Sequence, residues 1–364
     1  MRNSRIAIFV IMLILIGMGM VMIYSASSIP TWQRTGQSAG LLKKQITYIF
    51  VGFCMMFATM VVDYHKFVKL IKPMLAAGIF LLVLVLVPGI SRQAGGAKRW
   101  LHILGMNFQP SEFVKIVLIL YTADFINRKA RFLKDFWQGF VPPMMVLGAA
   151  TLLVLLQPDL GTAISFVVLV MTLLFVAGTR PAYLLASILA AVPVLYVLLF
   201  SVPYRRSRIM AFLNPWADPK GTGFQIIQSQ IALGSGGLFG VGLGQGRQKL
   251  FYLPAAHTDF IFSIIGEELG LLGCAAVVLL FILLIWNMSR IMFRVRDLYG
   301  KLICVGVIVL IAFSAVVNIG VSIGSLPTKG LPLPFISYGG SSLIFYMVAV
   351  GLLLNVSKSE EGIV

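Results

Sequence analysis

The chain has 364 residues, a mean hydropathy of +0.97 and only 11% charged residues, where about 25% is usual for a soluble domain. This composition excludes a water-soluble enzyme and a disordered chain, and it indicates a membrane protein. The apolar blocks are about twice the length of a barrel strand and lack two-residue alternation, which excludes a transmembrane β-barrel. The net charge of +17 is interpreted as a topology signal and an attraction to anionic lipids, not as a nucleic-acid site.

Ten predominantly apolar segments are candidates for helices that cross the bilayer, which takes roughly 20 residues per span. The first follows a short basic leader and is longer than the apolar core of a signal peptide, so we interpret it as a retained span. The sequence therefore predicts an all-α integral membrane protein whose residues 1–364 form a single polytopic domain. The segments are residues 6–24, 45–62, 70–87, 111–126, 136–156, 162–178, 183–199, 260–288, 302–323 and 341–356.

An even number of spans places both termini on one side of the membrane. Cytoplasmic termini put about twice as many Lys and Arg residues in the cytoplasmic loops as in the short outer loops, as the positive-inside rule requires. Residues 201–258, between the seventh and eighth spans, then form one long extracytoplasmic loop. Within it, residues 205–216 (RRSRIMAFLNPW) and 224–233 (FQIIQSQIAL) predict short helices, the first of them amphipathic and interfacial.

A glycine-rich stretch, residues 234–246 (GSGGLFGVGLGQG), follows these short helices. It does not predict a nucleotide loop, because no buried strand precedes it, the GxGxxG spacing is not met and no GK[ST] closes a P-loop.

Acidic residues near the predicted outer surface are the candidates for chemistry. Glu112 and Lys115 lie three residues apart at the outer start of the fourth span, so they can pair on one helix face; a structural pair and a functional one are equally open. Asp159, in QPDLG, lies at the outer hairpin between the fifth and sixth spans, where it is either a hairpin cap or a functional acid.

Asp259 lies where the long outer loop enters the eighth span. A charge at mid-bilayer costs about 2.5–3.5 kcal/mol on insertion scales, so an acid at such a junction is a functional candidate. If the helix begins at Asp259, Glu267 lies about 80° from it and Glu268 about 180° away. Glu267 is therefore a candidate to share the cavity of Asp259, whereas Glu268 is expected to point to another helix.

A carboxylate on a membrane face without ATP needs a substrate that carries its own energy, and a lipid-linked sugar pyrophosphate fits. Asp259 would act as general base on the attacking sugar hydroxyl, and nearby Arg, Lys or a divalent ion would meet the anionic leaving group. One base at this rim argues against the two-carboxylate pattern of glycoside hydrolases. The candidates for phosphate contact, each equally explained by headgroup anchoring, are Arg99, Arg205, Arg206, Arg208, Arg247 and Lys249.

Six motifs, in order along nearly the whole chain, resemble the SEDS family of shape, elongation, division and sporulation proteins. The fifth and sixth resemble the division and sporulation branch more than the elongation branch. The motifs are MIYSAS at 22–27, QPSEFVK at 109–115, QPDLGTA at 157–163, NPWADPKGTGFQIIQS at 214–229, GLGQGRQKLFYLPAAHTDFIFSIIGEELG at 242–270 and LPTKGLPLPFISYGGSS at 326–342.

This resemblance implies a ten-span bacterial inner-membrane protein, working in septal division or sporulation, that polymerises lipid II (undecaprenyl-pyrophosphoryl disaccharide-pentapeptide) into glycan strands. It implies an inverting, metal-dependent glycosyltransferase that uses Mg²⁺ or Mn²⁺. The implied partners are a cognate class B penicillin-binding protein, other divisome proteins and membrane lipids, without nucleic acid.

The family's catalytic aspartate carries over to Asp259, which is also the one candidate metal ligand. The motifs further place Glu112, Lys115, Asp159, His257 and Lys329 with the substrate-binding residues.

Two other functions are weighed against the polymerase. A lipid II flippase would use Glu112, Lys115 and Asp159 as a polar path, yet no unpaired acid continues that path through the cytoplasmic half. A scaffold that recruits a class B penicillin-binding protein through lipid-facing helices would leave no clear sequence mark, and it can coexist with an enzyme.

Overall fold

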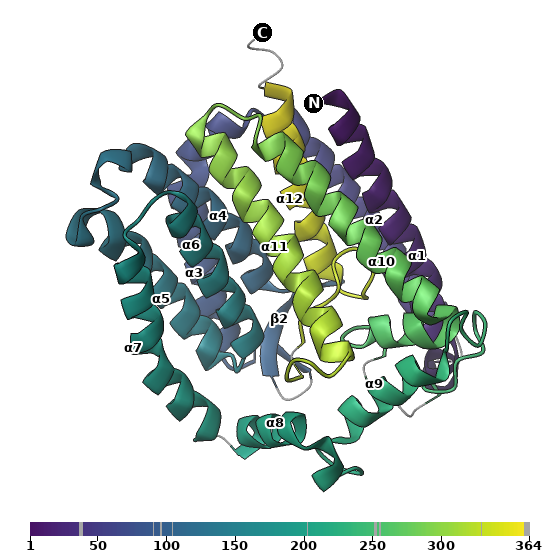
Figure 1. Cartoon of the computed structure of the whole chain (residues 1–364). Helices are drawn as coiled ribbons and strands as arrows, with labels where there is room; N and C mark the ends of the chain where they lie inside the picture. Colours follow the sequence, from purple (N-terminus) through teal and green to yellow (C-terminus); the bar gives the residue numbers. More distant parts are fainter. Residues whose placement is uncertain are drawn as a thin grey trace.

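The computed structural model describes residues 1–35, 39–89, 91–94, 97–103, 105–201, 203–250, 253–254, 256–328 and 330–359. Its long helices lie side by side in one bundle, with both termini at the same end (Figure 1). Each of the ten predicted segments coincides with a helix. The long helices are α1 (Arg2–Thr35), α2 (Gly40–Val61), α3 (Phe67–Leu86), α4 (Pro110–Arg128), α5 (Val141–Leu156), α6 (Leu160–Val176), α7 (Pro181–Phe200), α10 (Ile261–Met292), α11 (Leu298–Ser322) and α12 (Gly340–Ser359).

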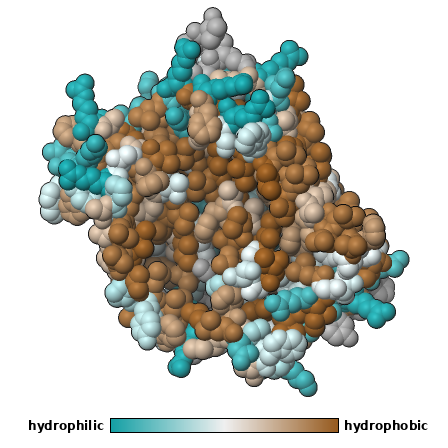
Figure 2. All heavy atoms as spheres, viewed as in Figure 1, coloured by the Kyte–Doolittle hydropathy of each residue, from teal (hydrophilic) through white to brown (hydrophobic). Residues whose placement is uncertain are grey.

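Seven described helices are long and apolar enough to cross a membrane, namely α1, α2, α3, α5 with the turn before it, α10, α11 and α12. On the face seen in Figure 2, apolar residues cover the middle of the bundle and most polar ones gather toward its two ends. This distribution is that of a multi-pass membrane protein. Over its most apolar stretch α12 is 83% buried, whereas α2 and α3 are 22% buried, so α12 is a central helix and α2 and α3 face the lipid.

Small residues let α12 approach α2 closely. A Cβ atom at Gly351 would meet the Thr59 hydroxyl and the Met56 carbonyl of α2, and one at Gly340 would meet the Tyr48 ring. Helices in lipid associate through such close packing, because the hydrophobic effect does not drive them together there.

A small antiparallel sheet between α3 and α4 is an unpredicted addition to the helical bundle, whose all-α class is confirmed. Its strands β1 (Ser91–Ala94), β2 (Ala97–Ile103) and β3 (Met106–Phe108) lie in chain order. The sheet is tied to the bundle, since Asn107 N donates to Tyr48 Oη at 3.0 Å and Asn107 O accepts from Ser341 Oγ at 2.8 Å. Its strands are too short for period-2 alternation to stand out in the sequence.

The outer segment contains the expected short helices, α8 (Pro203–Leu213) and α9 (Phe224–Ser235), joined through the turn η4 (Pro215–Ala217). Both lie across the end of the bundle opposite the termini (Figure 1). The remaining short turns are η1 (Tyr64–Lys66), η2 (Ala130–Phe132) and η3 (Phe136–Phe140).

Helix α10 is broken at Gly270, which has φ 68° and ψ −165°. The glycine-rich loop fills the break: Leu271 N donates to Gly237 O at 2.9 Å, and Val241 N donates to Glu267 O at 3.0 Å. The backbone groups released by the kink are thereby satisfied, and the loop is fixed to the first half of α10.

Replacing Gly270 by Ala should therefore destabilise the protein by roughly 2–4 kcal/mol, because a Cβ disfavours a positive φ and would also press on the main chain of Leu238 and Gly240. Unfolding in detergent measures the effect. Gly148→Ala in α5 is the matched control, since nothing lies within 4 Å of its Cβ position. Equal stabilities of the two variants would contradict the role given to Gly270.

Candidate functional site

The loop that carries Asp259 is held in place by its main chain. The carbonyl oxygens of residues 257–259 accept, in that order, from Tyr338 N at 2.9 Å, Ser337 Oγ at 2.6 Å and Asn318 Nδ2 at 3.1 Å. These donors come from α11 and from the segment between α11 and α12. The position of Asp259 at the start of α10 is thus fixed by groups other than its own carboxylate.

The protein around Asp259 favours the protonated acid. Removal from water raises the pKa of this half-buried carboxyl to about 6, with a smaller contribution from Asp159. Arg208, Arg99 and a hydrogen bond from Thr258 act in the opposite direction. A carboxylate whose pKa lies near the operating pH is suited to general base catalysis.

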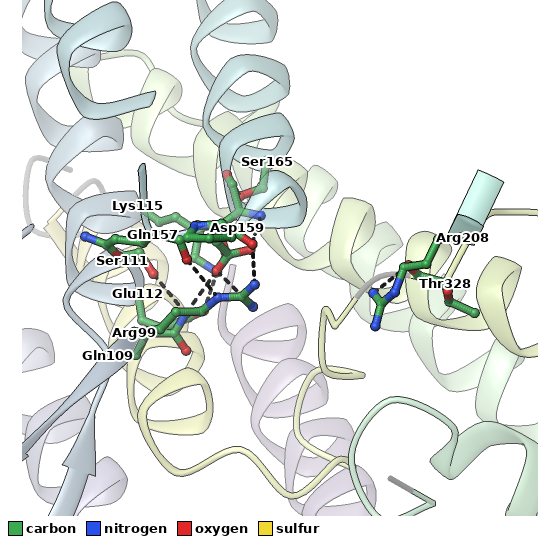
Figure 3. A network of polar contacts seen from close by, with 12 residues as sticks. Arg99, Gln109, Ser111, Glu112, Lys115, Gln157, Asp159, Ser165, Arg208 and Thr328 are labelled. Atoms are coloured by element: carbon green, nitrogen blue, oxygen red, sulfur yellow. Dashed lines mark hydrogen bonds and ion pairs between the residues drawn. The ribbon is translucent and has the colours of Figure 1, made fainter. Parts of the chain in front are cut away.

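Two nearby features keep the space beside Asp259 open and positively charged. Arg208 of α8 donates to Thr328 O at 3.2 Å, which anchors its guanidinium close to the segment that faces Asp259 (Figure 3). A Cβ atom at Gly330 would lie 3.3 Å from the Asp259 carboxylate, so glycine leaves room there that a side chain would occupy.

Asp159 lies at the start of α6, where it caps the helix. Its carboxylate accepts from Thr162 N at 3.1 Å and from Thr162 Oγ1 at 2.9 Å. Arg99 of β2 lies 3.6 Å from the same carboxylate and also donates to Gln157 O at 3.4 Å. The hairpin-cap interpretation is therefore confirmed, and Asp159 also holds Arg99 (Figure 3).

Glu112 and Lys115 form the expected ion pair in the first turns of α4. The two charged groups are 2.8 Å apart, and the residues are only 2% and 1% exposed. Lys115 also lies 5.7 Å from the centre of the Tyr346 ring and interacts electrostatically with Asp159. This pair and the Arg99–Asp159 pair form one charged cluster (Figure 3).

Lys249 is not an open phosphate ligand. It is 4% exposed, and its Nζ lies 2.5 Å from Glu268 Oε1 and 2.8 Å from Ser25 Oγ of α1. Ser25 in turn donates to Glu268 at 2.7 Å. A buried acid without a countercharge is very costly, so the charge of Lys249 is used within the protein. The expectation that Glu268 points to another helix is confirmed.

Glu267 faces the glycine-rich loop, and its described contacts do not place it beside Asp259. Its Oε1 atom accepts from Arg247 N at 2.6 Å and from Gln248 N at 3.1 Å. The helix begins at Ile261 and the loop folds back against it, so the angular calculation from Asp259 did not find this partner. The Arg247 side chain is exposed on a loop that Glu267 anchors.

The remaining predicted residues are placed as follows. His257 lies beside Tyr338, with ring centres 5.8 Å apart. Arg205 and Arg206 lie on α8 with Arg208, and Arg206 lines a separate cavity with Asp218. Lys329 lies outside the described residues.

Sequence reasoning missed the residues that hold the Asp259 loop, above all Asn318, Ser337 and Gly330. Asn318 carried a usable signal, because an amide inside an otherwise apolar span needs a buried partner. It is fully buried, and it also donates to Leu331 O at 2.9 Å.

Within the described ranges, no group of three or more His, Cys, Asp or Glu side chains is arranged to hold a metal ion. Asp259 offers one carboxylate. That donor set fits Mg²⁺ bound through one carboxylate and substrate phosphates, and it does not fit an all-protein cage.

The prediction for the buried pair concerns stability. Lys249→Met should destabilise the protein by about 3–5 kcal/mol, because Glu268 keeps a buried charge without its partner. Exposed Arg247→Met is the control and should change stability by less than about 0.5 kcal/mol. Unfolding in detergent reports both, and the double variant Lys249→Met/Glu268→Met should recover part of the loss. A single variant as stable as the parent would refute the pairing.

The fold and the site define a multi-pass membrane protein with a charged cluster and a raised-pKa carboxyl at the end of the bundle away from the termini. A family model for FtsW, RodA and SpoVE, described as a cell cycle protein, matches residues 5–362. The chain belongs to this family, which confirms the resemblance of its motifs.

Similar relatives support the assignment. The probable peptidoglycan glycosyltransferase FtsW of Geobacter sulfurreducens is 47% identical over 344 residues, which cover 94% of this chain and 92% of the relative. The stage V sporulation protein E of Bacillus subtilis is 43% identical over 356 residues, covering 98% and 97%.

Solved structures share the fold. A chain from a study of how a peptidoglycan synthase complex coordinates polymerization and crosslinking superposes with a TM-score of 0.81 and 31% identity, covering 97% of each chain. The crystal structure of Thermus thermophilus RodA gives a TM-score of 0.70 and 28% identity, covering 97% of this chain and 96% of that one.

Proposed function

We propose that this protein is a peptidoglycan glycosyltransferase that polymerises lipid II into glycan strands. The observation that carries the proposal is Asp259, a base with a raised pKa of about 6 that is held rigidly beside Arg208 and within the electrostatic reach of Arg99. The curated relatives named as peptidoglycan glycosyltransferases support the same activity.

The proposed topology places this site on the outer face of the membrane. In it, α1 to α7 and α10 to α12 form ten spans, and both termini are cytoplasmic. The Lys and Arg distribution between the short loops supports this orientation. The site then meets a substrate that brings its own pyrophosphate leaving group, as a membrane face without ATP requires.

In the proposed reaction, Asp259 takes the proton from the 4-hydroxyl of the acceptor sugar. The hydroxyl oxygen forms a bond to the anomeric carbon of the lipid-linked donor, the bond from that carbon to the pyrophosphate breaks, and undecaprenyl pyrophosphate leaves with inversion. Arg208 and Arg99 are placed to stabilise negative charge that develops on the leaving group. Asp159 and the Glu112–Lys115 pair position Arg99 and balance its charge.

The divalent cation, Mg²⁺ or Mn²⁺, remains part of the proposal. Asp259 is the protein carboxylate that would hold it together with the substrate's phosphate oxygens. When bound, such a cation supplies neutralisation of the pyrophosphate charge.

The proposed partners follow from the reaction and from the similar synthase complex. Strands made by this protein need crosslinking, which a cognate class B penicillin-binding protein would supply, and other divisome proteins would place both at the division septum. The alternative flippase is less well supported, because Glu112 and Lys115 are closed into an ion pair that is 2% and 1% exposed. A scaffold function is compatible with the enzyme.

Asp259→Ala and Asp259→Asn should abolish polymerisation, because the base is lost while its loop stays held by main-chain hydrogen bonds. The measurement is gel analysis of lipid II products made by purified protein with its penicillin-binding partner and Mg²⁺ or Mn²⁺. Asp135→Asn, which alters an exposed acid at the opposite end of the bundle, is the control and should keep full activity. Product ladders from the Asp259 variants would disprove the assignment.

Asp259→Asn should at the same time raise the free energy of unfolding near pH 7, by up to about 3 kcal/mol. A raised folded-state pKa means that stability is lost as the pH rises from the unfolded value of 3.8 towards about 6, so removing the charge restores it. Unfolding in detergent distinguishes this outcome from a structural role, in which Asn would destabilise the protein.

The pH dependence should report the same group. The kcat/KM of the polymerase should fall about tenfold per unit below pH 6 and level off above it, because only ionised Asp259 accepts the proton. Initial rates between pH 4.5 and 8 at constant ionic strength test this, with circular dichroism showing that the fold persists. A flat profile through pH 6 would remove Asp259 as the base.

A further inference from the structure

A cavity of about 250 Å³ lies between the first residues of α1 and the last turns of α10, at the bundle end that carries both termini. It is far from the site just described, which occupies the opposite end (Figure 1). Its walls are Met1, Arg2, Asn3, Ser4, Arg290 and Arg294. Among the described residues, three arginines and no carboxylate therefore line this cavity.

The side chains of Arg2, Arg290 and Arg294 form no hydrogen bond or ion pair with any described residue. Arg128, by contrast, lies 2.7 Å from Asp124. Unpaired guanidiniums that converge on one cavity bind phosphate well, because their N–H groups match two phosphate oxygens at a time.

Ser4 adds a polar group to the same cavity. It lines the cavity wall, and none of the described residues forms a hydrogen bond with its hydroxyl. That hydroxyl can donate to a phosphate oxygen in the cavity.

The helix faces beside the cavity indicate that the ligand is amphiphilic. Trp286 and Arg290 lie four residues apart, so they share a face of α10, and Arg294 lies in the turn that follows the helix. Arg2 and Ile6 are related in the same way on α1. Trp286 is 63% exposed and Ile6 is 53% exposed, so each helix presents an arginine next to an open apolar side chain.

We propose that this cavity binds the phosphate headgroup of an anionic phospholipid, with the acyl chains lying along Ile6 and Trp286. An anionic lipid is favoured over a zwitterionic one, because the arginines would repel a choline ammonium group. The bound lipid joins the ends of α1 and α10, two helices that the Ser25–Glu268 hydrogen bond joins near their other ends. It thereby supports the helix that Asp259 precedes.

The test is native mass spectrometry of the whole protein in detergent, titrated with phosphatidylglycerol or phosphatidylcholine. The wild type should bind one phosphatidylglycerol with a Kd about tenfold or more below that for phosphatidylcholine. Arg290→Gln/Arg294→Gln should raise the Kd for phosphatidylglycerol by about tenfold or more, as expected for lost charge-assisted hydrogen bonds. Ser4→Val should raise it by about 2- to 10-fold.

The matched control is Lys69→Gln/Lys72→Gln, which removes two exposed charges from α3 outside the cavity. It should change the Kd less than about twofold. Equal losses in the two double variants would mean diffuse attraction and would overturn the site. Arg290→Lys/Arg294→Lys keeps both charges and guards against misfolding. It should weaken binding by about 2- to 10-fold, because lysine cannot form the bidentate contacts of arginine. Wild-type affinity in this variant would count against a guanidinium site.

Competition by inorganic phosphate shows whether the cavity binds a lipid headgroup or a free phosphate ion. Millimolar phosphate should leave phosphatidylglycerol binding unchanged if the acyl chains contribute to affinity. Displacement of the lipid by phosphate alone would overturn the lipid assignment and identify a soluble anion as the ligand.

Discussion

The structure depends on how it keeps charge inside an apolar bundle. Glu112 with Lys115, and Glu268 with Lys249, are buried ion pairs, and each resolves the large cost of desolvating a single charge. Asp259 is treated differently: its main chain is held by neighbouring groups, while its carboxyl is left with a pKa of about 6. The same low-polarity surroundings that require pairing elsewhere therefore raise the pKa of the residue proposed as the base. The ionised carboxylate that the proposed reaction needs lowers the stability of the fold. The hydrogen bonds to the main chain of residues 257–259 hold the loop in place despite that cost.

Interactions between residues that are close in the sequence could be predicted, whereas those between distant residues could not. The ten apolar segments, the Glu112–Lys115 pair and the Asp159 cap are local, since partners lie within three or four residues or repeat with a helical period. They were predictable, and the structure contains all of them. Asp259 was already a functional candidate from its position where the outer loop enters a span, and the motif resemblance gave it the same catalytic role.

Long-range contacts decided the rest. The sequence alone indicates that Lys249 is an exposed cation. In the structure, Glu268 and Ser25, from other parts of the chain, form its buried partners. The direction of the Glu267 side chain depends on a loop that packs at the Gly270 kink. Helical periodicity cannot predict this contact, because the loop lies outside the helix. The sheet that carries Arg99 was missed because its strands are short and take their anchor from Tyr48 and Ser341.

The clamp on the Asp259 loop has a consequence for the order in which the chain is made. Glu112 and Lys115 sit on one helix, so their charges are matched as soon as α4 enters the membrane. The donors that hold residues 257–259 come from Asn318, Ser337 and Tyr338, which leave the ribosome well after those residues. A nascent chain therefore pairs the charges of α4 early, whereas the loop that carries Asp259 is fixed only after α11 and the segment that follows it have been made.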